Sequence, residues 1–110
     1  MDELNVSKES IASTSRKIEA LIAIGAGDII ESTLNKLINL QLSKYRDNIA
    51  RVNEDIKRFE TQYKMISDEF YRQFEAGELG DDADFFEWSS LYENVLLYEE
   101  RIAMMESLTS

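Results

Sequence analysis

The sequence predicts an all-α fold in which one long helix pairs with a C-terminal helix as a hairpin or bundle. Two observations carry this prediction. The chain of 110 residues has no proline and only four glycines, which fall in two pairs, so helices are interrupted at two places. Elsewhere apolar residues recur at alternating steps of three and four, the spacing of helices that pack along one face. We expect a single helical domain over residues 1–110, divided into segments 1–26, 28–65 and 67–106.

The first predicted helix runs from Ser7 to Ile24. Ser7 or Asn5 is a suitable N-cap. The middle of this segment is rich in Ser and Thr, which have low helix propensity, so we expect the helix to depend on packing for its stability. Its apolar residues lie on one face: Ile11, Ile18, Leu21 and Ile22. The Gly25-Ala26-Gly27 segment then ends the helix.

The second predicted helix covers residues 28–65 and begins at Asp28, which forms a variant of the capping box with Glu31. At 1.5 Å per residue it would be roughly 57 Å long. Ten apolar positions follow strictly alternating steps of four and three: Ile38, Leu42, Tyr45, Ile49, Val52, Ile56, Phe59, Tyr63, Ile66 and Phe70. A pattern this long is typical of a coiled coil. We therefore expect a homodimer that self-associates through Ile38, Leu42, Tyr45, Ile49, Val52, Ile56, Phe59 and Tyr63.

The last segment is predicted to hold a short helix over residues 68–76, capped by Ser67 and ended by Gly77. A final helix then begins after Asp81 or Asp82 and continues to about Glu106. A second apolar row lies on it, again at steps of three and four: Trp88, Leu91, Val95, Tyr98, Ile102 and Met105. This row can pair with the row on the long helix, which makes a helical hairpin the simplest architecture for one chain.

The composition argues against catalysis. The chain has neither cysteine nor histidine, so the usual zinc ligand sets and nucleophilic sites that rely on imidazole cannot be built within it. No glycine-rich phosphate loop accompanies the abundant carboxylates. We expect no enzymatic activity and no cofactor. The acidic N-terminus lacks the pattern of a targeting peptide, and no apolar run approaches the roughly 20 residues of a membrane span, so we expect a cytoplasmic protein.

Charge is distributed unevenly along the chain. Residues 31–64 hold seven basic and five acidic side chains, whereas residues 65–110 hold two and twelve. Nucleic acid should be repelled by the second block, and a partner with a basic surface would suit it. A solvated acidic exterior with no partner explains the same charge.

Four acids at the start of the final helix, Asp81, Asp82, Asp84 and Glu87, could in principle hold a hard cation. Their spacing lacks the central glycine and alternating ligands of an EF-hand loop, and capping of the helix explains them better, so we predict no metal. Beside them, Phe85, Trp88 and Tyr92 form an aromatic stripe. Such a stripe either completes the core or provides an exposed anchor for a partner.

Residues 63–92 carry a Phe-x-x-x-Phe step at Phe70 and Phe74, Gly-Glu-Leu-Gly-Asp at 77–81 and an acidic aromatic run at 84–88. This segment resembles a family of small helical proteins of archaea and cyanobacteria, some of which are taken to be antitoxins of two-gene toxin–antitoxin modules. The resemblance implies binding of a basic, nuclease-type toxin, while a coiled-coil scaffold or adaptor is the alternative. We expect the partner to contact Phe70, Phe74, Asp81, Asp82, Asp84, Phe85, Phe86, Glu87, Trp88 and Tyr92.

Overall fold

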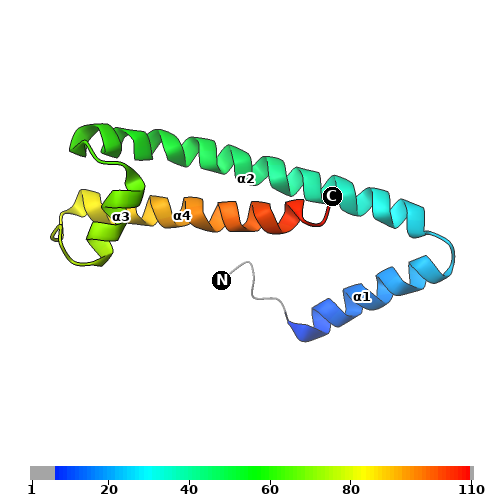
Figure 1. Ribbon diagram of the computed structural model, residues 1–110. Helices are drawn as coiled ribbons and strands as arrows, with labels where there is room; N and C mark the ends of the chain where they lie inside the picture. Colours follow the sequence, from blue (N-terminus) through cyan, green and yellow to red (C-terminus); the bar gives the residue numbers. More distant parts are fainter. Residues whose placement is uncertain (1–6, 110) are drawn as a thin grey trace. The chain divides into compact units, whose positions relative to one another are not determined.

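The computed structural model describes residues 7–109, which form four helices and no strand (Figure 1). The helices are α1 (Lys8–Ala23), α2 (Gly27–Tyr63), α3 (Ser67–Glu75) and α4 (Ala83–Glu106). The all-α prediction is therefore confirmed, and each predicted helix is present within one or two residues of its expected bounds. No helix within this range is long and apolar enough to cross a membrane.

The chain divides into two compact units, and the division falls inside α2. The first unit ends at Asn39 and the second begins at Leu40. This differs from the single domain expected over residues 1–110. Glycines mark where a helix ends, but a unit ends where packing ends, and α2 continues through that point.

The helix ends follow local sequence rules. Ser7 caps α1, since its side chain accepts a hydrogen bond from the Ser10 N–H; Asn5, the other candidate, lies outside the described residues. At the C-terminal end, Gly25 has a φ of 97°, and the Ala26 N–H donates to the Leu21 carbonyl over 2.9 Å. This is a Schellman ending, which requires a left-handed residue.

The second helix begins at Gly27, so Asp28 is not its cap as predicted but lies in the first turn. There its negative charge still favours the positive end of the helix. At the other end, Met65 N–H donates to the Glu60 carbonyl in another Schellman-type ending, and the left-handed position is occupied by Lys64, with φ 54°. Because α2 ends at Tyr63, Ile66 does not continue the apolar row and is 67% exposed.

In the second unit, α4 runs antiparallel along the part of α2 that begins at Leu40, and α3 packs against α4 (Figure 1). The register is set by ring contacts: Tyr45 lies 5.5 Å from Tyr98, and Phe59 lies 5.8 Å from Trp88, between ring centroids. The helical hairpin predicted from the two apolar rows is thus present within one chain.

The core of this unit is centred on Ile56, Phe70, Trp88 and Val95, which are all buried. Leu42 is also buried. Tyr45, Ile49, Val52, Phe59 and Tyr63 are partly buried. From Leu42 onward, the heptad row therefore packs within its own chain, because α4 supplies the matching row, and self-association through these positions stays a prediction. Only Ile38 of the predicted self-association set belongs to the first unit.

Candidate protein-interaction surfaces

Two of the aromatic residues expected to contact a partner are core residues instead. Phe70 and Trp88 are completely inaccessible to solvent. Their rings stack with centroids 3.7 Å apart and planes 3° from parallel, and Phe59 and Tyr63 also contact the indole. The prediction that a partner touches these two side chains is therefore wrong, since neither can reach a partner while the unit is folded.

Ser67 also has a role that differs from the prediction. It does not cap α3, whose N-cap is Ile66 without a side-chain hydrogen bond. Its backbone N–H and its Oγ each donate to Glu60 Oε2 over 2.8 Å, and its Oγ accepts from Trp88 Nε1 over 2.9 Å. One buried hydroxyl thus connects α2, α3 and α4 and satisfies the only polar atom of the tryptophan side chain.

The other predicted aromatics lie nearer the surface. Phe74, Phe85 and Tyr92 are partly buried, whereas Phe86 is 55% exposed. The ring of Phe86 meets that of Phe74 edge to face, with centroids 5.3 Å apart. Phe86 is the member of the aromatic cluster best placed to anchor a partner.

The four acids at the start of α4 have different surroundings. Asp82 is the N-cap and accepts from the Asp84 N–H over 2.9 Å, as predicted. Asp84 accepts a hydrogen bond from the Tyr63 hydroxyl over 2.6 Å. This bond, with burial and the nearby carboxylates, raises the pKa of Tyr63 to about 12. Asp81 and Glu87 are exposed. No group of acidic side chains within residues 7–109 is arranged to hold a metal ion.

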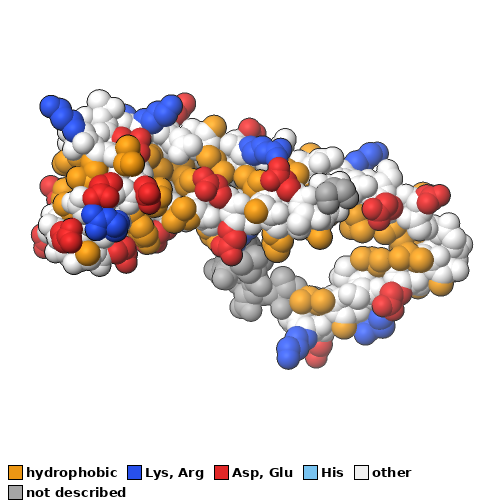
Figure 2. Space-filling view, in the orientation of Figure 1, with side chains coloured by type: hydrophobic (Ala, Val, Ile, Leu, Met, Phe, Trp, Pro, Cys, Tyr) orange, Lys and Arg blue, Asp and Glu red, His pale blue; other side chains and the backbone are white. Residues whose placement is uncertain are grey.

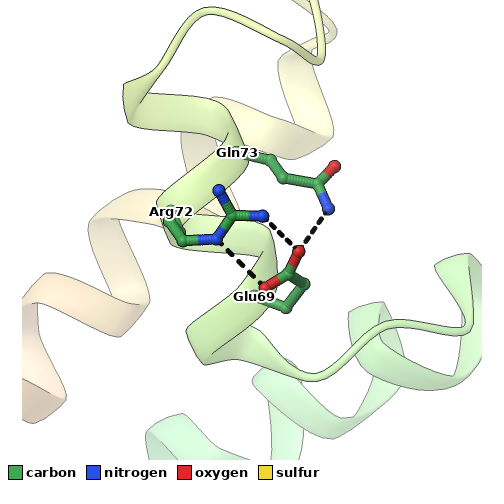
Figure 3. A network of polar contacts seen from close by, with 3 residues as sticks. All are labelled: Glu69, Arg72 and Gln73. Carbon is green, nitrogen blue, oxygen red and sulfur yellow. Dashed lines mark hydrogen bonds and ion pairs between the residues drawn. The ribbon is translucent and has the colours of Figure 1, made fainter.

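A network of polar contacts that includes an ion pair lies on α3 (Figure 3). Glu69 accepts from Arg72 Nη2 over 2.5 Å and from Gln73 Nε2 over 2.7 Å. These bonds lower the pKa of Glu69 to about 2. The guanidinium of Arg72 is thereby partly neutralised, so it adds little positive charge to the surface around it.

The acidic surface extends over α3 and the start of α4. From Gln73 to Glu100 the chain has nine acidic residues and no lysine or arginine. The exposed acids of this stretch run from the end of α3 into the first turns of α4: Glu75, Glu78, Asp81, Asp82 and Glu87. Figure 2 shows acidic side chains gathered over the same end of the second unit. We call these five residues and Phe86 the acidic surface. Its charge suits a basic partner.

The first unit has a different surface. No residue between Ser7 and Asn39 is buried. Figure 2 shows hydrophobic side chains in view along α1 and the start of α2. Seven large apolar residues of this unit are between 38% and 78% exposed: Ile11, Leu21, Ile22, Ile24, Ile29, Leu34 and Leu37. We call them the N-terminal apolar face.

Covering this face would release a substantial free energy. The seven exposed fractions amount to about four fully exposed Leu or Ile residues, so complete burial would contribute about 6–12 kcal/mol per chain. This is comparable with the roughly 4–15 kcal/mol that association loses in translational and rotational freedom. This exposed apolar face is therefore a candidate interaction surface.

The sequence revealed the face of α1 through Ile11, Leu21 and Ile22, but Ile24, Ile29, Leu34 and Leu37 were missed. Ile24 is the C-cap of α1, and Ile29, Leu34 and Leu37 lie off the heptad row of α2, which dominated the pattern. They could have been found from the high frequency of apolar residues in this segment, because no other part of the chain carries an apolar row that would pair with it.

No protein-family model matches the chain, and neither a curated protein nor a solved structure is similar enough to count as a match. The interpretation of its function therefore rests on its own surfaces.

Proposed function

We propose that this protein is a non-enzymatic protein-binding module that acts as an antitoxin, covering the basic face of a nuclease-type toxin with its acidic surface. The observation that supports this proposal is the stretch from Gln73 to Glu100, in which nine acids occur without a single base. A nuclease that binds RNA needs a basic face, and a carboxylate surface can compete for that face by charge.

The helices that carry the acidic surface are held in place by the core of the second unit. The Trp88 and Phe70 stack and the Ser67 hydrogen bonds fix α3 against α4. A fixed surface loses little conformational entropy on binding. Phe86 adds an exposed aromatic side chain among the carboxylates, and an aromatic anchor surrounded by polar groups is the usual composition of a binding hot spot.

The test is co-expression of the full chain with the product of the adjacent gene in its native genome, followed by binding and growth assays. We expect that product to be a small basic protein whose toxicity is relieved by this chain. The combined variant Asp81→Asn and Glu87→Gln should weaken the complex at least tenfold, mostly through a slower association rate. The matched control, Glu99→Gln with Glu100→Gln, changes the charge equally but lies more than three turns beyond Glu87 along α4 and should change affinity less than threefold.

Unchanged affinity of the Asp81 and Glu87 variant, or unrelieved toxicity, would contradict the proposal. A helical scaffold or adaptor is the second candidate, favoured by the N-terminal apolar face. It predicts partner binding that depends on the apolar side chains of the first unit and is insensitive to neutralisation of the acidic surface.

A further inference from the structure

Within residues 7–39, no side chain covers the N-terminal apolar face. The segment from Ser7 to Asn39 contains α1 and the first thirteen residues of α2, and none of its residues is buried. A single helix of 16 residues, rich in Ser and Thr at its centre, is marginal in water without packing. The length and regular ending of α1 therefore indicate that its apolar side chains are packed in the functional state.

The net charge of this segment helps to decide whether a basic partner or a second copy of the chain packs against it. Residues 7–39 carry four basic and four acidic side chains, and their net charge is zero. Residues 40–109 carry eight basic and sixteen acidic side chains, and their net charge is minus eight. A basic partner would be attracted to the second unit and would find no such attraction at the first. Two copies of this chain repel each other through their second units but not through their first.

The charges are also complementary within the segment. Residues 8–23 of α1 carry three bases and two acids, whereas residues 27–39 of α2 carry one base and two acids. When α1 of one copy packs on the start of α2 of another, a net charge of plus one meets minus one. In a dimer with a two-fold axis this contact occurs twice, and both copies use the same surface.

We propose that the segment from Ser7 to Asn39 is a homodimerisation element in which α1 and the start of α2 from two copies form a four-helix bundle. Four helices enclose a common core that two helices cannot. This element differs from the self-association surface predicted from the heptad row, which α4 occupies. It also includes none of the residues of the acidic surface.

Sedimentation equilibrium of the full chain over a concentration series tests the proposal. We expect a dimer with twice the chain mass of 12.7 kDa. The double variant Ile29→Lys and Leu37→Lys should raise the dissociation constant on the order of 100-fold, since it places four charges in the shared core of the dimer. The control Met104→Lys alters a side chain of similar exposure on α4 and should change the constant less than threefold.

Folding and association can be separated in the same samples. Ile29 and Leu37 are 70% and 52% exposed in the single chain, so their replacement should leave the fluorescence of Trp88 in the second unit unchanged. Helicity measured by circular dichroism should fall on dilution, together with the mass. A wild-type monomer at 100 µM, or a dimer unaffected by the double variant, would overturn the proposal. So would a monomer whose face is covered only in a complex with a basic partner.

Discussion

Substitution of Ser67 by alanine should destabilise the protein by more than its small volume suggests. The change removes the hydroxyl that donates to Glu60 and accepts from Trp88. The indole N–H then lies in a site with no solvent access and has lost its acceptor. An unsatisfied buried donor costs roughly 1–3 kcal/mol. Loss of the hydrogen bond from the Ser67 hydroxyl to the Glu60 carboxylate adds about 1 kcal/mol, which is less than usual for a bond to a charged group because the Ser67 backbone N–H still donates to Glu60. We expect a loss of about 2–4 kcal/mol in the free energy of unfolding.

The measurement is urea denaturation followed by the fluorescence of Trp88, the only tryptophan in the chain. Its emission reports directly on the site that is changed. Ser90→Ala is the matched control, because Ser90 is exposed on the same helix as Trp88, and it should change the free energy of unfolding by less than 0.5 kcal/mol, roughly the effect of a surface substitution.

A double-mutant cycle with Trp88→Phe, followed by circular dichroism, isolates the hydrogen bond from the packing of the ring. In the Trp88→Phe background, Ser67→Ala should be about 1–2 kcal/mol less harmful, since no indole N–H remains to be satisfied. If Ser67→Ala destabilises equally in both backgrounds, or by less than about 0.5 kcal/mol in the wild type, the hydroxyl does not hold the three helices together as inferred.

Three other predictions concern local features of the second unit. Lys64→Gly should stabilise the chain by about 1 kcal/mol in urea denaturation, because Lys64 ends α2 with a φ of 54° that glycine adopts without strain; a destabilised variant would contradict this. In an absorbance titration, Tyr63 and Tyr71 should ionise near pH 12, because each donates a hydrogen bond to a carboxylate. The stability that these bonds contribute is therefore present below pH 10 and lost as pH rises towards 12. The variants Tyr63→Phe and Tyr71→Phe should each remove one of the two transitions. The pKa of Glu69 is lowered to about 2, chiefly by Arg72, so its small contribution is present above pH 4.5 and lost as pH falls towards 2. Glu69→Gln should therefore flatten the acid limb of the stability profile, and an unchanged limb would count against the ion pair.

The positions at which helices begin and end could be predicted from local sequence. Ser7 and Asp82 act as N-caps because their side chains reach N–H groups one turn inside the helix. Gly25 and Gly77 end α1 and α3 because both adopt a positive φ. These are local interactions over a few residues, and a local pattern is sufficient to predict them. The two apolar rows similarly predicted that α2 and α4 pair.

Which apolar side chains are covered could not be predicted from the sequence and follows from the packing of the helices. The same heptad spacing suits a neighbour from the same chain and a neighbour from a second copy, so the row on α2 could not distinguish the two. Burial shows that α4 fills this role from Leu42 onward, that Trp88 and Phe70 are core residues, and that the seven residues of the N-terminal apolar face stay exposed. The physical reason is that burial depends on which distant segments meet, and that information is not carried by the spacing of residues along one helix.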